Sequence, residues 1–276
     1  MALQQDALDM LQKTSRTFFI PISRLPPGLQ EAIASAYLCM RAIDEIEDHA
    51  QLETLEKIRQ LRTISQVLQA QTSVATFAMD EFARAFRTQQ HLLPEVTLRI
   101  GEWACHAPEA IAPRIWDAIA AMAERMAEWI ANGWKMRTEA DLDRYTFGVA
   151  GAVGLLICDI WAWFDGGQMH RSHAIHFGRG LQAVNILRNR TEDLARGVDF
   201  FPTGWSEARM KEYALHNLVQ ADTYAKTLPP GPFAYFIKIP LVLAYATLDA
   251  LASGQTKLSR SAVLQLMQHI DEESLA

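Results

Sequence analysis

The sequence is poor in cysteine, and its few thiols are widely spaced. Its 276 residues include three cysteines, Cys39, Cys105 and Cys158, without the spacing of a zinc site. An odd, sparse set excludes a disulfide framework and indicates a reducing compartment. The first ten residues also lack the basic and apolar regions of a secretory signal. We therefore expect a cytoplasmic protein.

Positive charge is also scarce. Lys and Arg number 26 against 32 Asp and Glu, which gives a formal net charge of −6. Binding to nucleic acid is driven by basic patches that release counterions, so we expect no nucleic acid among the partners. Half of the residues are apolar and 21% are charged, which is typical of a globular chain with a large core.

Uninterrupted apolar runs of membrane-spanning length are missing, although two segments approach that length. The run 147–164 contains Asp159, and the run 233–252 contains Lys238 and Asp249. Such charges are costly at the centre of a bilayer, so we predict that both runs are buried core helices. Contact with a membrane surface stays open, especially for a lipid substrate.

Alternating, β-branched segments typical of strands are few, and apolar residues repeat at helical spacing almost throughout. Proline and glycine interrupt this pattern, most clearly at 26–28, 166–167 and 228–232. No segment has the composition of a linker, and no repeat emerges. We predict an all-α protein that forms a single domain over residues 1–276.

The segment 31–50 predicts a helix with an unusual polar face. At about 100° per residue, four side chains share that face: Tyr37, Arg41, Asp44 and Asp48. A solvated acidic face is the ordinary interpretation of such a charge run. The apolar positions beside it instead indicate a packed helix, on which paired carboxylates need a cation. Mg²⁺ typically binds one or two carboxylates together with substrate phosphates, and an arginine can bind a phosphate oxygen.

Residues 179–202 predict a second helix of the same kind. Oxygen-bearing side chains recur there one turn apart, with an arginine beside them: Gln182, Asn185, Asn189, Asp193 and Arg188. An ordinary polar helix end before Gly197 explains the segment equally well. Two such helices could face each other and hold a diphosphate and metal ions between them.

Five short motifs follow one another along nearly the whole chain. They are S-R-T-F at 15–18, the stretch 37–48 ending in D-x-x-E-D, Tyr145 with V-A-G-A-V-G at 149–154, the stretch 182–202 ending in F-F-P, and the carboxy-terminal stretches 239–248 and 256–258. In this order they resemble the squalene/phytoene synthase family. The first acidic motif is more similar to squalene synthases than to phytoene synthases.

The resemblance implies an isoprenoid synthase fold around a central apolar cavity. It implies Mg²⁺-dependent, head-to-head condensation of two farnesyl diphosphates to presqualene diphosphate, followed by NADPH-dependent reduction to squalene. Alternatives within this fold stop at presqualene diphosphate, form a hydroxylated product or use a longer prenyl diphosphate. A non-catalytic lipid-binding or assembly protein is the alternative from another class. The oligomeric state stays open.

The resemblance also implies roles for individual residues. The implied metal ligands are Asp44, Glu47, Asp48, Asn185, Asn189 and Asp193. The implied substrate contacts are Ser15, Arg16, Phe18, Tyr37, Arg41, Gln182, Asn185 and Arg188. The implied catalytic residues are Tyr145, which matches a tyrosine assigned to proton transfer, with Arg41, Asp44, Asp48 and Asp193. Lys257 matches a position that contacts NADPH.

Three positions depart from the family pattern. Asn189 stands where the second acidic motif usually begins with an aspartate, so one negative charge is lost and metal binding is expected to weaken. Val198 and Ser259 stand where arginines are usual, in segments that contact NADPH. The sequence therefore supports the condensation better than the reduction.

Overall fold

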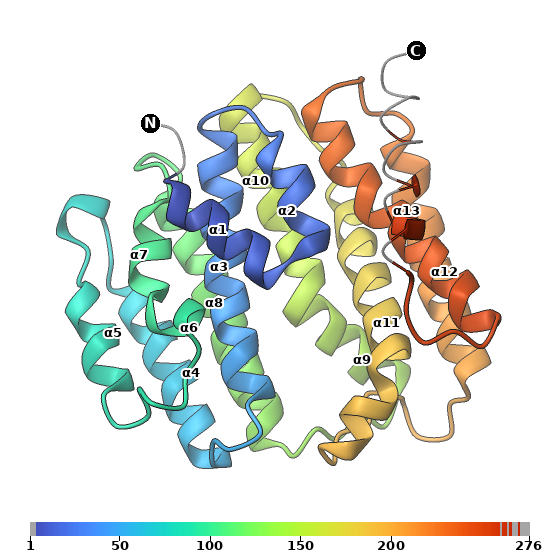
Figure 1. Cartoon of the computed structure of the whole chain (residues 1–276), viewed down its shortest axis with the longest axis horizontal. Helices are drawn as coiled ribbons and strands as arrows, with labels where there is room; N and C mark the ends of the chain where they lie inside the picture. Colours follow the sequence, from blue (N-terminus) through green and yellow to red (C-terminus); the bar gives the residue numbers. More distant parts are fainter. Residues whose placement is uncertain (1–3, 260, 264, 267–269, 271–276) are drawn as a thin grey trace. The chain divides into compact units, whose positions relative to one another are not determined.

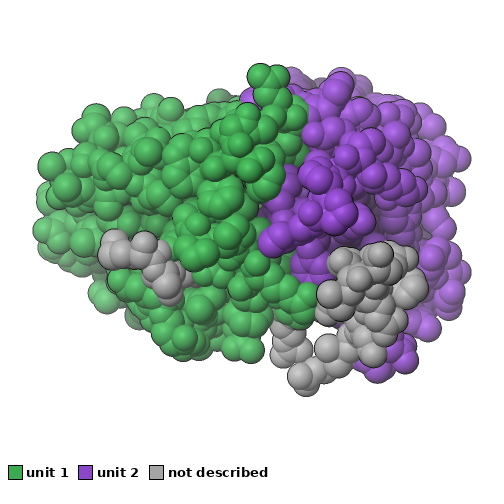
Figure 2. Space-filling model, turned by 90° about the horizontal axis from the view of Figure 1, so that it is seen from above, with its two compact units in different colours: residues 1–135, 156–169 green, residues 136–155, 170–276 purple. Residues whose placement is uncertain are grey.

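The computed structural model describes residues 4–259, 261–263, 265, 266 and 270. Within these residues every regular element is a helix, which confirms the all-α prediction (Figure 1). Packing contacts divide the chain into two compact units (Figure 2), Met1–Lys135 with Leu156–Met169 and Met136–Leu155 with His170–Ala276. The single domain stays a prediction.

The first unit is built around α3. Its elements are α1 (Gln5–Thr14), α2 (Arg16–Ser23), α3 (Leu29–Asp48), α4 (Thr54–Gln69), η1 (Val74–Thr76), α5 (Met79–Phe86), α6 (Glu95–Leu98), α7 (Ile100–Cys105), α8 (Ala112–Ala131) and most of α10 (Ala152–Asp165). Helices α1, α2, α4, α6, α7 and α8 all pack against α3. This helix therefore forms the centre of the unit's core.

Both ends of α3 are fixed by hydrogen bonds. At its start, Gly28 adopts a φ of 87°, and its N–H donates to the Glu31 carboxylate, which satisfies a backbone donor of the first turn. Near its end, the Lys57 ammonium donates to the Glu47 carbonyl over 2.6 Å. Thr97 donates to the buried Ala42 carbonyl over 3.1 Å. The carboxyl end of α3 is thus held in one place.

The second unit is built around α11. Its elements are α9 (Glu139–Thr146), the π-helix η2 (Phe147–Gly151), the start of α10, α11 (Arg171–Ala195), α12 (Glu207–Ala225) and α13 (Pro232–Ala252). Helix α11 packs against α9, η2, α12 and α13. It begins before the predicted segment and ends at a turn in which Gly197 has a φ of 81°.

Gly154 of the V-A-G-A-V-G motif and Gly178 of α11 let two helix backbones touch. A Cβ atom on Gly154 would lie 2.0 Å from the Ala174 carbonyl oxygen. A Cβ atom on Gly178 would lie 2.1 Å from the Ala150 carbonyl oxygen. Both distances are far below van der Waals contact, and backbone atoms cannot turn aside as a side chain can. Packing of α11 on this segment therefore requires glycine on both sides.

Two helical segments are long and apolar enough to cross a membrane by length and composition. In Glu139–Asp165, 44% of the apolar window is buried, and in Pro232–Ala252 the share is 61%. The larger share agrees with the predicted core helix for α13. Core burial of the run 147–164, which lies in the segment with the smaller share, stays a prediction, as does that of the run 233–252.

Replacing Gly178 with alanine should strongly destabilise the second unit. The added methyl would overlap the Ala150 carbonyl, so we expect the free energy of unfolding to fall by about 2–4 kcal/mol, since the helices must separate. Thermal unfolding followed by circular dichroism measures the loss. Thr191→Ala, at an exposed position of the same helix, is the control and should shift stability by less than about 0.5 kcal/mol. Equal melting temperatures for the two variants would contradict the packing argument.

Candidate functional site

Acidic side chains gather at the carboxyl end of α3, where a helix disfavours them. Asp44, Glu45, Glu47 and Asp48 occupy the last two turns, and no basic residue lies in the last turn. The carboxyl end of a helix carries partial negative charge, so acids there are destabilising and cations stabilising. Helix propensity and stability do not explain this arrangement, whereas a bound cation would.

Asp44 experiences this repulsion most clearly. Its side chain is partly buried, and burial is the largest cause that raises the pKa of this carboxyl from 3.8 to about 7. Arg41 lowers the pKa, while the neighbouring Asp48 and Glu45 raise it. Glu47 is buried and Asp48 is exposed. A divalent cation beside Asp44 would favour the ionised carboxylate and relieve this repulsion.

Arg41 has a hydrogen-bond donor available for a ligand. Its guanidinium pairs with Glu45 one turn later. Its Nε atom is buried and has no hydrogen-bond partner among the described residues. A buried donor without a partner is energetically costly, and a phosphate oxygen would satisfy it. The Arg41 position therefore suits the phosphate contact that the sequence predicts.

The start of α2 brings other predicted substrate contacts to α3. The Ser15 hydroxyl accepts a hydrogen bond from the Phe18 N–H over 3.0 Å and so caps α2. The Phe18 and Tyr37 rings lie 5.5 Å apart. Burial raises the pKa of Tyr37, while a hydrogen bond with Ser15 and the nearby Arg41 lower it. Arg16 begins α2, and its side chain lies outside the described part of the structure.

The second group of predicted residues lies along α11. Gln182, Asn185 and Asn189 are partly exposed, and Arg188 is exposed. Asp193 is 8% exposed, and its Oδ1 atom accepts a hydrogen bond from the Arg196 guanidinium over 2.6 Å. The Asn189 Oδ1 atom accepts one from Arg188 Nε over 3.1 Å. Both of these oxygens are thus already bonded to guanidinium groups.

Tyr145 is buried at the end of α9 and packs in parallel on Phe200. The ring centroids lie 4.7 Å apart at an interplanar angle of 18°. This contact joins the third sequence motif to the aromatic ending of the fourth. Next to Tyr145, Thr146 and Asp143 bind the Tyr213 hydroxyl, which donates to Asp143 over 2.7 Å and lies 3.1 Å from the Thr146 hydroxyl.

Sequence reasoning missed several of these supporting residues. Asp143 and Tyr213 lie on α9 and α12, and no motif or spacing connects them. Arg179 also reaches this group, since its guanidinium donates to the Asp143 carbonyl over 3.3 Å. Arg196 directly follows the end of α11. In the sequence, only Gly197 indicates a turn at this point.

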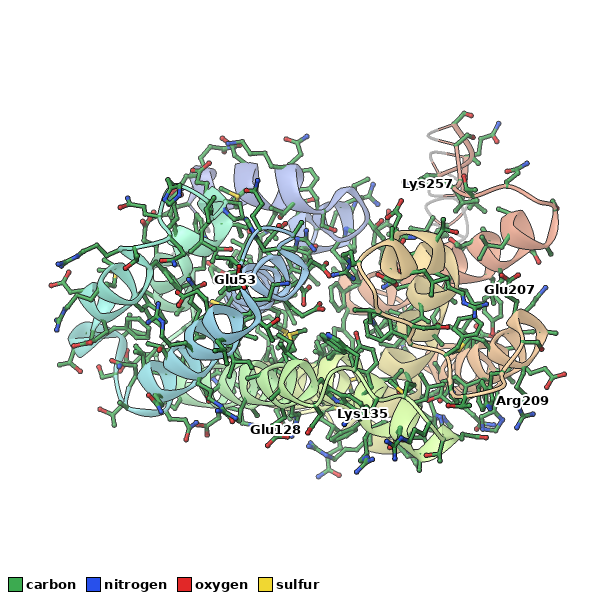
Figure 3. All side chains as sticks on the ribbon, turned by 90° about the horizontal axis from the view of Figure 1, so that it is seen from below. Glu53, Glu128, Lys135, Glu207, Arg209 and Lys257 are labelled. Atoms are coloured by element: carbon green, nitrogen blue, oxygen red, sulfur yellow. The ribbon has the colours of Figure 1, made fainter. Side chains whose placement is uncertain are left out.

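Lys257 lies beside the acidic end of α11. Its ammonium is 3.4 Å from Glu192 Oε1, and both side chains are mostly exposed (Figure 3). Val198 is 7% exposed, so the position that usually carries an arginine is a core position in this chain. The hydroxyls of Ser259 and Ser261 lie 3.0 Å apart. This region therefore has fewer basic side chains that could contact the phosphates of NADPH than the family pattern implies.

The described residues of the two units form no preformed metal cluster. Among the described residues, no three His, Cys, Asp or Glu side chains are placed to hold a metal ion together. This arrangement fits Mg²⁺ only with substrate phosphates completing its coordination. Because α3 and α11 belong to different units, their predicted facing arrangement stays a prediction.

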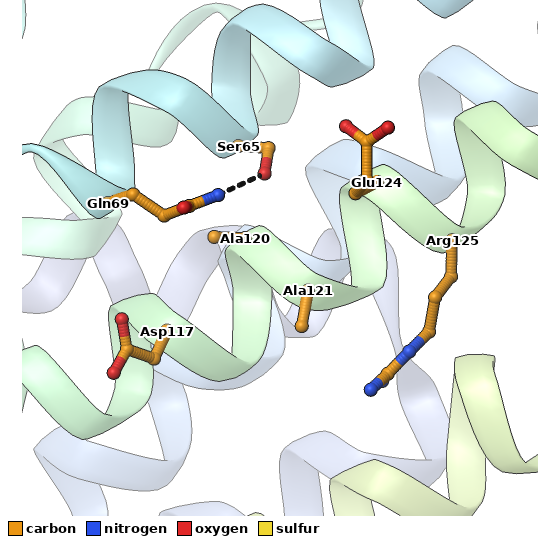
Figure 4. Close-up of a pocket in the computed structure, with 7 residues that line it drawn as sticks. All are labelled: Ser65, Gln69, Asp117, Ala120, Ala121, Glu124 and Arg125. Carbon is orange, nitrogen blue, oxygen red and sulfur yellow. Dashed lines mark hydrogen bonds between the residues drawn. The ribbon is translucent and has the colours of Figure 1, made fainter.

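A surface pocket of about 410 Å³ lies elsewhere in the first unit (Figure 4). Its lining comes from α4 and α8: Ser65, Gln69, Asp117, Ala120, Ala121, Glu124 and Arg125. None of these residues was singled out by the sequence. The deep apolar cavity implied by the resemblance stays a prediction.

Comparison with known proteins decides the family. The squalene/phytoene synthase family model matches residues 11–217, three quarters of the chain. The chain belongs to the squalene/phytoene synthase family. Similar relatives include squalene synthases of Eremothecium gossypii, 29% identical over 92% of this chain, and of Schizosaccharomyces pombe, 26% identical over 94%. The chain spans 63% of the length of each relative.

Solved structures of this family share the fold. TcSQS bound to the ligand E5700 matches with a TM-score of 0.75 at 23% identity, covering 96% of this chain and 84% of that one. A dehydrosqualene synthase in complex with a ligand matches with a TM-score of 0.62 at 15% identity, covering 97% and 95%. The predicted all-α isoprenoid synthase fold is thereby confirmed.

Removing the Asp44 carboxylate should stabilise the metal-free protein. The folded state keeps the Asp44 proton up to about pH 7, whereas the unfolded chain loses it near pH 3.8, so stability falls as the pH rises between these values. Asp44→Asn avoids this loss and should gain on the order of 1–2 kcal/mol at pH 8, about 2–6 °C in Tm. Thermal unfolding in EDTA at pH 5 and pH 8 measures it.

The gain should be larger at pH 8 than at pH 5. Asp48→Asn is the matched control, because it removes the same charge from an exposed position and should gain less. An Asp44→Asn variant no more stable than wild type at pH 8 would show that burial of this carboxylate costs nothing.

Proposed function

We propose that the protein condenses two farnesyl diphosphates head to head to presqualene diphosphate and then reduces this product to squalene. The observation that carries the proposal is the group of carboxylates at the carboxyl end of α3 beside the buried, unpartnered Nε of Arg41. A cation and a phosphate are the ligands that this pair of features requires. Family membership supports a prenyl diphosphate as the source of the phosphate.

Asp44 and Asp48, with Glu47 beside them, are the residues that would hold Mg²⁺. When bound, Mg²⁺ supplies positive charge that stabilises a leaving diphosphate. Arg41 binds the same diphosphate through its Nε–H and so holds the first substrate with its allylic carbon near the aromatic rings of Phe18 and Tyr37. Loss of diphosphate leaves an allylic cation, and the alkene of the second substrate attacks it.

Tyr145 takes part in the proton loss that closes the cyclopropane ring. Its ring orientation is fixed by the parallel contact with Phe200, and its helix is fixed by the Asp143, Thr146 and Tyr213 hydrogen bonds. Buried aromatic faces stabilise a neighbouring carbocation and exclude water that would convert it to an alcohol. Helix α12 and the segment after α11 thereby position Tyr145.

Lys257 is the residue that would hold NADPH, which supplies hydride when bound. Its ion pair with Glu192 places the ammonium beside the end of α11. Because Val198 is buried and Ser259 carries no charge, release of presqualene diphosphate is the second candidate outcome. We further propose that the protein acts in the cytoplasm.

Incubation with labelled farnesyl diphosphate tests the function. With Mg²⁺ alone we expect release of diphosphate and accumulation of presqualene diphosphate, and with added NADPH we expect squalene. Presqualene diphosphate under both conditions would support the second candidate and exclude the reduction. An alcohol product would show that water reaches the cation. Absence of diphosphate release under all conditions would leave a non-catalytic binding protein.

Asp48→Ala should abolish turnover without harm to the fold. Asp48 is exposed and ends α3, so its removal relieves an unfavourable interaction with the helix dipole. We expect unchanged or slightly higher thermal stability, with diphosphate release from farnesyl diphosphate reduced at least about 100-fold. Glu53→Ala, which removes another exposed acid of the same unit (Figure 3), should leave the rate unchanged. Full activity of Asp48→Ala would remove Asp48 from the site.

A further inference from the structure

The segment between α11 and α12 supplies the ring that packs on Tyr145. Residues 198–206, all of them described, form no helix. Phe200 and Phe201 within this segment are nevertheless only 5% and 4% exposed. A segment without helical hydrogen bonds needs other contacts to hold one conformation. The contacts that fix the segment therefore also decide where the Phe200 ring lies.

Arg190 of α11 makes two contacts with this segment. Its guanidinium carbon lies 3.7 Å from the centroid of the Phe201 ring, and its Nη2 atom donates to Asp199 Oδ2 over 3.2 Å. A cation over an aromatic face is attracted to it, and more strongly when the pair is partly desolvated. The Arg190 side chain is 27% exposed. Arg190 therefore holds both a ring and a carboxylate of the segment.

Asp199 transmits this constraint to the backbone around Phe200. While its Oδ2 atom accepts from Arg190, its Oδ1 atom accepts from the Phe201 N–H over 3.0 Å. A bond from an aspartate to the N–H two residues later fixes the backbone of a turn. Phe200 lies between the two bonded residues, and its ring stacks on Tyr145 at 4.7 Å. Contacts within the second unit thus lead from Arg190 to Tyr145.

We propose that Arg190 is a positioning residue for Tyr145, which acts through Asp199 and the stacked Phe200 ring. Loss of the guanidinium frees the turn at 199–201, so the Phe200 ring moves and Tyr145 loses its fixed orientation. This inference rests on the proposed function for the proton loss in which Tyr145 takes part. Displacement of a reacting group by about 1 Å can cost roughly 100-fold in rate. Arg190 thus affects the chemical step and leaves substrate binding unchanged.

Fluorine NMR of para-fluorophenylalanine introduced at position 200 tests the positioning without turnover. The Tyr145→Leu variant gives the resonance of this ring without its stacking partner. We expect Arg190→Met and Asp199→Asn each to move the resonance from its wild-type position toward that reference. Asp199→Asn keeps an oxygen for the Phe201 N–H and removes only the charge opposite Arg190, from a side chain that is 38% exposed. A wild-type resonance in either variant would overturn the proposal.

Steady-state kinetics with farnesyl diphosphate test the consequence for the reaction. Arg190→Met should lower kcat for presqualene diphosphate formation by about 10- to 100-fold, while KM changes by less than about twofold. Arg190→Lys keeps the charge opposite Asp199 and should recover part of this loss. The double variant Arg190→Met/Asp199→Asn should be no slower than Arg190→Met, because both changes remove the same contact. Losses that add in the double variant, or a raised KM at unchanged kcat, would contradict the positioning role.

Arg144→Met is the matched control for both measurements. Arg144 precedes Tyr145 in the chain and forms an ion pair with Asp141, but its side chain is 74% exposed. Its replacement also removes an arginine–carboxylate pair, and it should leave the resonance at position 200 and kcat at wild-type values. A protein that releases no diphosphate from farnesyl diphosphate would contradict the proposed function, whereas the resonance would still decide whether Arg190 positions the ring pair.

Discussion

Negative charge at the carboxyl end of α3 sets the main electrostatic constraint on this protein. The helix dipole, the partial burial of Asp44 and the neighbouring Glu45 and Asp48 all oppose ionisation at the same place. The surrounding helices and the bonds from Lys57 and Thr97 prevent the helix end from moving away. The fold therefore maintains an unfavourable charge arrangement that a cation and its anionic ligand can relieve.

The second unit solves a similar problem with its own residues. Asp193 is 8% exposed, and the guanidinium of Arg196, three positions later, donates a hydrogen bond to its carboxylate. Residues of this unit also hold Tyr145 in place. Phe200, in the segment after α11, stacks on its ring, and Tyr213 of α12 contacts the neighbouring Thr146.

The helical periodicity of the sequence was enough to predict much of the polar face of α3. Arithmetic at about 100° per residue placed Tyr37, Arg41 and Asp44 on one face of a helix, and these three are partly exposed on a helix that is otherwise mostly buried. Helix class was also accessible from the strong helical pattern, whereas the bounds of α11, Arg171–Ala195, differ from the predicted 179–202 at both ends. The family motifs added residues such as Tyr145 that periodicity alone would leave as core.

The rest depended on contacts that no sequence spacing encodes. The Asp193 and Arg196 pair requires the chain to reverse at Gly197, and spacing along an ideal helix stops before that turn. The Asp143 and Tyr213 bond joins side chains 70 positions apart, and its geometry arises only when α9 and α12 pack. The need for glycine at 154 and 178 likewise appears only when two backbones are brought together.

The π-helix η2 makes the register of the chain around Tyr145 sensitive to length. A π-turn accommodates one more residue than an α-helical turn, so the helical faces before and after Phe147–Gly151 are offset by about 100°. Loss of a single residue from this segment would restore a regular helix, yet it would swing Tyr145 away from Phe200 or Gly154 away from Ala174. Substitutions are therefore easier to accommodate here than any change in the number of residues.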